Sequence, residues 1–369
     1  FIAVTAQPVP YYADTTAIFN TLCQANSNSL LLDSAEIGSK NSLQSLVLVN
    51  ATVKITCLGH NVTFKALNEN GKQVLKEIHP VLTTLGKISA VNFEEEFSVQ
   101  FSPLDNQLDE DSKLQSATIF DGLRVISSLY QHSQTPIFLG GLFAYDLVAN
   151  FIPMDGITLQ NDGINCPNYS FYLAEHLITI DHQNQQATLK SFCFAQEEQV
   201  NIAKTSLSIA QKLKNIDNVL SIKAASDEVK TNFEDPEFTG IVKTLKHHIN
   251  IGDVFQIVPS RRFSLACPNT LASYAQLKQN NSSPYMFYMN DEDFILFGAS
   301  PESALKYEPE NRQLEIYPIA GSRPRGFDAH GNIDPELDAR LELELRLDHK
   351  EQAEHLMLVD LARNDIARV

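Results

Sequence analysis

The stretch from residue 45 to residue 66 reads Ser45-Leu-Val-Leu-Val-Asn50, Val53-Lys-Ile-Thr-Cys57 and Val62-Thr-Phe-Lys-Ala66, with short breaks between the runs. Apolar and β-branched residues dominate each run, and the breaks contain polar residues or glycine. Runs of this length and composition are typical of β-strands. The first part of the chain is therefore expected to form a sheet.

A meander is expected further along the chain. Two strands, Ser170–Ala174 and Leu177–Asp181, precede a polar turn at residues 182–185, and a third strand covers Ala187–Phe192. Successive strands joined by short turns are usually antiparallel neighbours. An amphipathic helix is predicted from Gln196 to Leu213.

The second half of the chain mixes helical and strand patterns. Asp235-Pro236 combines a helix N-cap with a proline favoured in the first turn, and apolar residues then recur at helical spacing until Gly252. Further strands are expected at residues 254–258, 286–289, 294–297 and 314–317, followed by a helix from about Asp348. These elements predict an α+β protein of packed, largely antiparallel sheets flanked by helices, with regions 1–214 and 233–369 joined by a polar linker at 215–232.

Composition narrows the classes of function. The 369 residues carry a formal net charge of −17, which argues against a nucleic-acid surface or an anionic membrane as partner. The five cysteines are dispersed without a C-x-x-C pair, a pattern that predicts free thiols in a reducing cytoplasm. Apolar runs are too short to span a membrane.

Glu351 and Glu354 are the strongest candidates for chemistry. Their spacing by three places both carboxylates on one helix face, where they could ligate a hard cation such as Mg²⁺. Asp348 stands three residues before Glu351, and this capping-box pattern favours a capping role for Glu351 over a direct metal bond. Glu354 has no such alternative and is the better ligand candidate.

Four motifs in this order resemble those of the chorismate-utilising enzymes. They are Gly252–Phe263, Gly298–Glu302, Pro318–Gly326 and the Glu351/Glu354 helix, and the similarity extends upstream to Leu30–Ser34 and Gly141–Leu147. Within the family, the motifs most resemble the large, aminating subunits that form anthranilate. The resemblance implies a layered α/β/β/α fold, with residues 1–214 serving regulation and partner contacts and residues 233–369 forming part of the chorismate-binding catalytic domain.

The resemblance also assigns catalytic roles. Chorismate must lose a ring hydroxyl, which is a poor leaving group unless an acid protonates it, and Glu302 stands at the family's acid position. Burial would have to raise the pKa of Glu302 for this role; taken alone, it is an ordinary turn glutamate. Mg²⁺ held by Glu354, with Glu351 bound directly or through water, would act as a Lewis acid on the ring carboxylate.

The motif at residues 318–326 is expected to bind substrate. Ser322 stands where the family more often has threonine, and with Ala320 and Gly321 it would present a hydroxyl and backbone N–H groups to a carboxylate or leaving oxygen. Arg323 and Arg325 suit either a solvated turn or a place near an anionic substrate or partner.

Two positions discriminate among the reactions of the family. Isochorismate- and salicylate-forming relatives carry a lysine where this chain has Gln256, and glutamine cannot act as the base that activates water. Aminodeoxychorismate-forming relatives often carry a lysine in place of Ala320, where it bonds to the ring, and alanine removes that route. Both residues favour ammonia as the nucleophile and anthranilate with pyruvate as the products.

A second set of residues resembles the site at which tryptophan acts as feedback inhibitor. Met286 and Phe287 would contact the indole, while Ser34 and the neighbouring Asp33 would recognise the amino group. Packing between two sheets is the alternative role for these apolar side chains. Asp33 replaces the more usual glutamate. The full set is Leu32, Asp33, Ser34, Lys40, Pro284, Tyr285, Met286 and Phe287.

Ammonia is expected from a separate glutamine amidotransferase subunit, because no cysteine here stands in a nucleophile-elbow context. The partnership implies a hetero-oligomer, in this family a heterotetramer. The pattern of the last helix has no stop signal before Val369, so the chain is expected to be cut short of further catalytic residues and to be inactive alone. The alternatives are an aminodeoxychorismate synthase and a non-catalytic tryptophan-binding module.

Overall fold

The structure is a computed structural model that describes residues 1–24, 26–34, 43–105, 107–131, 135–152, 154, 166–216 and 228–368. Two compact units form, and each is discontinuous in sequence. The first contains Phe1–Ile222 and Thr270–Ala299, and the second contains Lys223–Asn269 and Ser300–Val369. The segment 270–299 therefore joins the unit formed by the N-terminal region, rather than the remainder of the predicted second domain.

Two long antiparallel strands are the centre of the first unit. β3 (Gln44–Leu58) and β8 (Tyr169–Asp181) pair from Gln44/Asp181 to Cys57/Tyr169, with register shifts between Leu48 and Val53. The sequence predicted two short strands in place of each of them. The polar breaks are instead absorbed as β-bulges, which bend a strand without ending it.

Each half of β3 has different neighbours. Its first half pairs with β2 (Ser29–Asp33), and its second half pairs with β4 (Asn61–Ala66). The resulting order is β1-β9-β8-β3-β2-β12-β13, with β4, β5, β6 and β7 attached beside it, and the pairs assigned in this sheet of eleven described strands are antiparallel. The remaining bounds are β1 Ala3–Val9, β5 Lys87–Asn92, β6 Glu96–Gln100, β7 Leu139–Phe143, β9 Gln186–Cys193, β12 Tyr285–Asn290 and β13 Ile295–Ser300.

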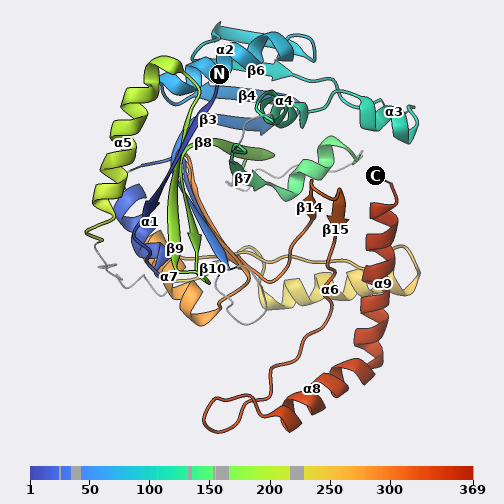
Figure 1. Ribbon diagram of the computed structural model, residues 1–369. Helices are drawn as coiled ribbons and strands as arrows, with labels where there is room; N and C mark the ends of the chain where they lie inside the picture. Colours follow the sequence, from blue (N-terminus) through green and yellow to red (C-terminus); the bar gives the residue numbers. More distant parts are fainter. Residues whose placement is uncertain are drawn as a thin grey trace. The chain divides into compact units, whose positions relative to one another are not determined.

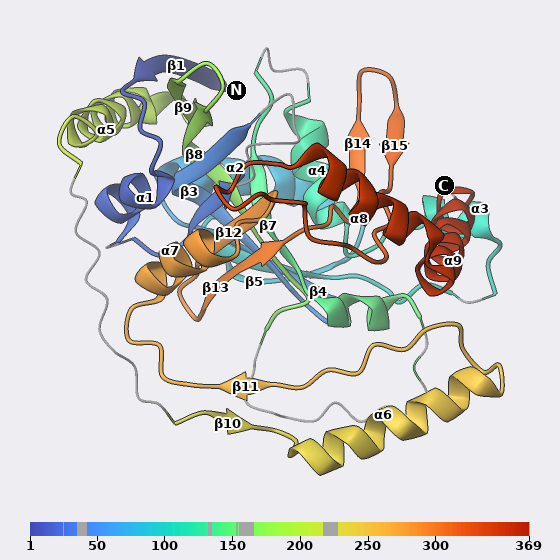
Figure 2. The same ribbon diagram turned by 90° about the horizontal axis from the view of Figure 1, so that it is seen from below.

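Helices cover the sheet and enclose two hydrophobic cores (Figure 1). Successive residues of a strand point to opposite faces. Leu48 accordingly joins one core beneath α2, whereas Val47 and Val49 join the other with α1, α5 and α7. α7 also packs against α1 and β12 (Figure 2). The helices of this unit are α1 Thr15–Cys23, α2 Glu69–Leu82, α3 Glu110–Gln115, α4 Asp121–Leu129, α5 Gln199–Lys212 and α7 Thr270–Asn280, with 3-10 turns at Tyr145–Asn150 and Gln196–Glu198.

A buried polar cluster occupies the bulge of β8. Glu175 Oε2 accepts hydrogen bonds from Asn68 Nδ2 at 3.0 Å and Asn70 Nδ2 at 2.9 Å. Its other oxygen, Oε1, lies 3.6 Å from His176 Nδ1, which is buried without a hydrogen-bond partner among the described residues. Burial raises the pKa of Glu175 to about 7 and lowers the pKa of His176 to about 4.

A second buried cluster fastens the turn between β12 and β13 to the sheet. Lys54 Nζ on β3 donates to Asp291 Oδ1 at 2.7 Å, and Tyr172 on β8 donates to Asp291 Oδ2. Lys54 and Asp291 are 8% and 5% exposed. The ion pair between Lys54 and Asp291 helps to hold the β12–β13 turn, which is distant in sequence, against β3 of the first unit.

The second unit is built from helices and two-stranded pieces. It contains β10 (Lys230–Thr231) paired with β11 (Phe263–Ser264), β14 (Lys306–Glu308) paired with β15 (Gln313–Glu315), α6 (Asp235–Asn250), α8 (Pro335–Leu347) and α9 (His349–Ile366). The pairing of β10 with β11 can be followed in Figure 2. None of the described residues of α6, α8 or α9 is buried.

Two details of the sequence prediction for this unit were wrong. Glu234, rather than Asp235, is the N-cap of α6, because Asp235 already lies in the helix and its carboxylate pairs with Arg261 at 2.6 Å. Residues 254–258 do not form a strand, since no partner strand pairs with them in the described chain. The positive φ of 83° at Gly252 is consistent with the predicted helix stop.

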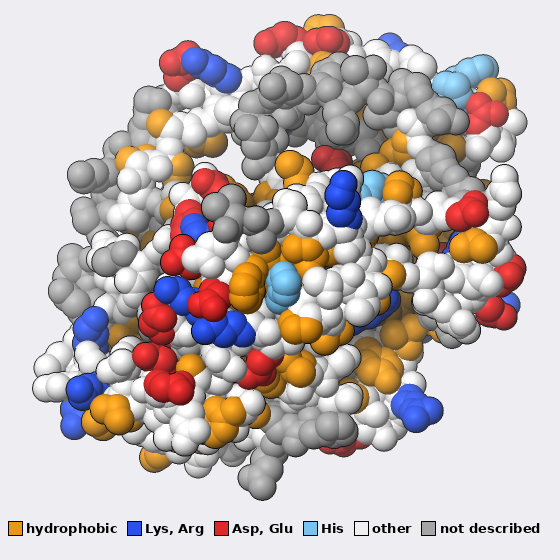
Figure 3. Space-filling view, turned by 90° about the horizontal axis from the view of Figure 1, so that it is seen from above, with side chains coloured by type: hydrophobic (Ala, Val, Ile, Leu, Met, Phe, Trp, Pro, Cys, Tyr) orange, Lys and Arg blue, Asp and Glu red, His pale blue; other side chains and the backbone are white. Residues whose placement is uncertain are grey.

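Within the described residues, no helix is both long enough and apolar enough to cross a membrane. Acidic and basic side chains lie close together on the face drawn in Figure 3. Ion pairs at the edge of α2 follow the same pattern: Lys72 pairs with Glu69 and Glu95, and Lys76 pairs with Glu94.

Candidate active site

The segment 318–326 of the second unit is tied to the beginning of α8. Arg325 donates two hydrogen bonds to Asp338, at 2.8 Å to Oδ1 and 2.7 Å to Oδ2, and the backbone N–H of Gly326 donates to Oδ1 at 2.9 Å. These bonds, with that from Arg325 the strongest, lower the pKa of Asp338 to about 2. A Cβ on Gly326 would lie 2.4 Å from the backbone nitrogen of Asp338, so glycine permits this close approach.

The same segment is tied to the beginning of α9 through Arg323. Its Nη1 donates to Glu351 Oε1 at 3.2 Å, and its Nη2 donates to Asp348 Oδ2 at 3.0 Å. The two arginines, for which the sequence suggested a solvated turn or an anionic substrate, therefore pair with carboxylates of the chain itself.

The N-cap predicted at Asp348 is confirmed. Its Oδ1 accepts from the backbone N–H groups of Lys350 at 3.0 Å and Glu351 at 3.2 Å. The hydrogen bond from Glu351 N, with smaller effects of Lys350 and Arg323, lowers the pKa of Asp348. The reciprocal bond of a capping box is not formed, because Asp348 N donates to Glu344 O. Glu351 therefore offers its side chain to Arg323 rather than to the helix end.

Gly321 lies directly against the carboxylate of Glu351. A Cβ built on Gly321 would stand 1.8 Å from Oε2 and 2.3 Å from Cδ of Glu351. The absence of a side chain thus leaves the space that this carboxylate fills. Ala320 is half-buried beside it, and Ser322 is exposed. The structure accordingly brings the predicted substrate-binding motif and a predicted metal ligand together.

Glu302 also contacts this segment. Its Oε1 accepts a hydrogen bond from Ile319 N at 3.3 Å, and its backbone is held by Ser300 Oγ at 3.0 and 3.3 Å. The residue is exposed, so the burial expected of a catalytic acid is not present in this structure. Glu302 contacts the segment at Ile319, the residue immediately before Ala320.

Glu354 and Glu351 fit a divalent cation that takes two carboxylates and completes its shell with water or substrate oxygens. Both residues are half-buried in α9, and Glu351 already lies in the space beside Gly321 that a Cβ would fill. Among the described residues, Glu354 makes no hydrogen bond or ion pair, and no cluster of three or more acidic, histidine or cysteine side chains could hold a metal. The protein alone thus supplies an incomplete set of ligands.

Gln256 is exposed in the irregular segment that follows α6. Among the described residues, its side chain forms no hydrogen bond with the other predicted catalytic residues. Its suggested role in selecting the nucleophile stays a prediction.

The predicted inhibitor residues lie in the first unit, where β2 pairs with β12. Asp33 is opposite Met286, and Leu32 is opposite Phe287. Met286 is 1% exposed and faces the core with α1 and α7, whereas Phe287 points to the other face. Strand pairing therefore brings the two predicted segments together but places these two apolar side chains on opposite sides of the sheet. Tyr285 is 39% exposed, Ser34 and Pro284 are half-buried, and Lys40 lies outside the described residues.

Asp33 already accepts hydrogen bonds from three side chains. It accepts from Thr15 Oγ1 at 2.7 Å, from Ser45 Oγ at 2.5 Å and from Lys278 Nζ. Burial alone would raise the pKa of Asp33, but the charge and hydrogen bond of Lys278, with those of Ser45 and Thr15, lower it on balance. Asp33 is 4% exposed and lies within this network. The sequence did not reveal Lys278, because a lone lysine near a helix end carries no signal of a buried partner.

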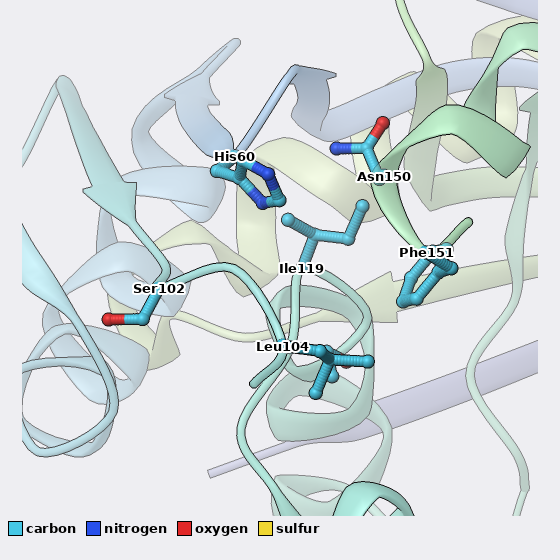
Figure 4. Close-up of a pocket in the computed structure, with 7 residues that line it drawn as sticks. His60, Ser102, Leu104, Ile119, Asn150 and Phe151 are labelled. Atoms are coloured by element: carbon cyan, nitrogen blue, oxygen red, sulfur yellow. The ribbon is translucent and has the colours of Figure 1, made fainter. Parts of the chain in front are cut away.

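A small hollow in the first unit is lined by other residues (Figure 4). His60, Ile119, Asn150 and Phe151 face it, and it has room for about one water molecule. No predicted site residue lines it.

Comparison with known proteins explains why these motifs occur together. A model of the chorismate-binding enzyme family matches residues 75–369. This chain belongs to the chorismate-binding enzymes. The match includes every predicted catalytic and metal-ligating residue, together with the predicted inhibitor residues at 284–287.

Curated relatives agree over nearly the whole chain. Anthranilate synthase component 1 of Haemophilus influenzae is 95% identical over 369 residues, which are 100% of this chain and 71% of that protein. The protein of the same name from Escherichia coli is 45% identical over 97% of this chain and 69% of its own length. The chain thus spans about 70% of these relatives.

Solved structures support the fold. Anthranilate synthase component I from Streptococcus pneumoniae superimposes with a TM-score of 0.58 at 22% identity, covering 90% of this chain and 63% of that one. The menaquinone-specific isochorismate synthase from Escherichia coli gives a TM-score of 0.56 at 16% identity, covering 98% and 62%. The prediction of an α+β fold with a large antiparallel sheet and flanking helices, as in chorismate-utilising enzymes, is confirmed.

Proposed function

We propose that this chain is the aminating part of an anthranilate synthase, a lyase that converts chorismate and ammonia to anthranilate and pyruvate. The observation that carries the proposal is the convergence of three motifs within the second unit. Gly321 lies against Glu351, and Glu302 bonds to Ile319 of the same segment. The 95% identity to a protein named anthranilate synthase component 1 supports the same reaction.

Glu302 supplies the proton that leaves with the ring hydroxyl. Its Oε1 accepts from Ile319 N, which orients the carboxyl group and leaves Oε2 to carry the proton. A bound substrate would cover this exposed group and exclude water from the proton transfer. The backbone of residues 320–322 and the Ser322 hydroxyl would bind a carboxylate or the leaving oxygen.

Glu354 and Glu351 would hold Mg²⁺. When bound, this ion would polarise the ring carboxylate of chorismate and orient the ring. Gln256 and Ala320 support amination over the alternatives, because neither can act as a basic or covalent lysine. Aminodeoxychorismate formation is the nearest competing reaction.

Ammonia would reach the site from a glutamine amidotransferase subunit in a cytoplasmic hetero-oligomer, a heterotetramer by analogy with the family. Tryptophan would inhibit by binding where β2 meets β12. Ser34 and the backbone there are the better candidates to contact the ligand's ammonium group, since Asp33 is occupied by Lys278. Tyr285 and Phe287 are the more accessible side chains for contact with the indole.

Anthranilate fluorescence tests the role of Glu302. The assay supplies chorismate, Mg²⁺ and ammonium salt to the chain extended to the length of its relatives, and compares it with Glu302→Gln. The variant should lose at least about 100-fold in kcat, the typical contribution of a general acid. Glu336→Gln, at an exposed glutamate of α8, is the matched control and should retain activity. Equal activity of the two variants would remove Glu302 from the reaction.

A further inference from the structure

Arg323 occupies an unusual position between the substrate motif and the metal ligands. Its guanidinium contacts two carboxylates at the start of α9, with single bonds of 3.2 Å to Glu351 and 3.0 Å to Asp348. Its Nη1 also donates to Ser322 O at 3.0 Å. One side chain thus joins the substrate-binding segment, the helix cap and a proposed cation ligand.

Arg325 shows what a purely structural pair looks like in the same segment. It binds Asp338 through two parallel hydrogen bonds of 2.8 and 2.7 Å, and Asp338 is not a candidate ligand. Bidentate pairs of this kind are strong and specific. Arg323 instead divides its donors between two carboxylates, and a single longer bond to each is easier to exchange.

The two oxygens of Glu351 are in different surroundings. Oε1 accepts from Arg323, while Oε2 occupies the space left by the missing side chain of Gly321. The Glu351 side chain is only 16% exposed, so it has little freedom to turn away. A cation that needs this carboxylate must either share it with a positive guanidinium or displace that group.

We propose that Arg323 is a positioning residue that competes with a divalent cation for the carboxylate of Glu351. The inference rests on the proposed function, because it takes Glu351 and Glu354 as the cation site. In the free enzyme, Arg323 holds Glu351 beside Gly321 and offsets its charge. When the cation binds, the guanidinium is released from Glu351 but keeps its bond to Asp348.

Binding of Mn²⁺, used as a probe for Mg²⁺ and measured by electron paramagnetic resonance without substrate, tests this role. Arg323→Gln should lower the Kd for Mn²⁺ about twofold to fivefold, the range expected when a partly exposed competing ion pair is removed. Arg323→Lys should give a smaller change. The gain should shrink as ionic strength rises, because the competition is electrostatic.

Arg325→Gln is the matched control, since it removes the same charge two residues away. Its Kd for Mn²⁺ should equal that of the wild type, and circular dichroism should show all variants folded. An unchanged or higher Kd for Arg323→Gln, or an equal decrease in Arg325→Gln, would overturn the competition. If the wild type bound no Mn²⁺ with or without chorismate, the metal assignment itself would fall and this inference with it.

Discussion

Replacing Glu175 by glutamine should change how the stability of the first unit depends on pH. The residue sits in the bulge of β8, with Asn68 and Asn70 donating to Oε2 and His176 Nδ1 near Oε1. His176 Nε2 lies 3.4 Å from the carbonyl of Ile202, so the hydrogen of the neutral ring is assigned to Nε2 and Nδ1 is a bare acceptor. A protonated Glu175 would donate to that nitrogen after a short rotation.

As pH rises, the pKa shifts of Glu175 and His176 change the stability of the folded chain in opposite directions. Burial raises the pKa of Glu175 from 4.5 to about 7, so its contribution to stability is full below pH 4.5 and is lost as pH rises to 7. Burial lowers the pKa of His176 from 6.5 to about 4, so stability is gained as pH rises from 4 to 6.5. Between pH 4.5 and 6.5, folded and unfolded chains each hold one proton on the pair, and its net effect is nearly flat.

Glutamine removes only the first of these two effects. The raised pKa of Glu175, from 4.5 to about 7, corresponds to about 3 kcal/mol, since one pKa unit is about 1.4 kcal/mol. Glu175→Gln should therefore gain about 3 kcal/mol relative to wild type between pH 4.5 and 7.5. Its amide would keep the bonds from the asparagines and donate to His176.

Urea unfolding from pH 4.5 to 8, with the difference in unfolding free energy plotted against pH, measures this gain. Glu197→Gln is the control at an exposed glutamate, and its difference curve should be flat within about 0.5 kcal/mol. Glu198, which also raises the pKa of Glu175, stays unchanged in both variants. A flat difference curve for Glu175→Gln would refute the claim that burial raises the pKa of Glu175 to about 7.

Three further substitutions test the packing and the sites. Asp33→Asn should cost about 3 kcal/mol in urea unfolding, because it leaves Lys278 without its buried partner, whereas Lys306→Met, at an exposed pair, should cost much less; equal costs would contradict the assigned network. Gly71→Ala should cost several kcal/mol, since its Cβ would lie 2.0 Å from the backbone oxygen of Thr52, and a thermal midpoint within about 2 °C of wild type would disprove that contact. Gly321→Ala should weaken Mn²⁺ binding, because the new Cβ takes the space that the Glu351 carboxylate fills; unchanged binding would remove Glu351 from the cation site.

Local patterns predicted α5, α6 and α9 and about half of the described strands, because such patterns depend only on neighbouring residues; helices such as α2 and α7 were not predicted. The runs at residues 45–57 were identified as strand, but the bulges that fuse them into β3 depend on pairing with β8, which no local pattern contains. The expected strand at residues 254–258 failed for the same reason. Alternating apolar residues favour a strand, but a strand also requires a partner, and none is present among the described residues.

The candidate site, too, was only partly predictable from the sequence. Motif order named Glu302, Gly321 and Glu351 as candidates, and in the structure Glu302 and Glu351 both contact the segment 318–326. The partners that hold them were not predictable, because Arg323 and Lys278 each bind an acid distant in sequence. The strand expected at residues 286–289 already places Met286 and Phe287 on opposite faces, but which of them faces the core depends on the pairing of β12 with β2, which the sequence does not show.

The most direct test of the central claim is to identify the product made from chorismate, Mg²⁺ and ammonium salt. Liquid chromatography with mass detection would compare this chain with one extended to the length of its relatives. The expected products from the extended chain are anthranilate and pyruvate. Aminodeoxychorismate or isochorismate as the product, or no product from an extended chain that is folded, would contradict it.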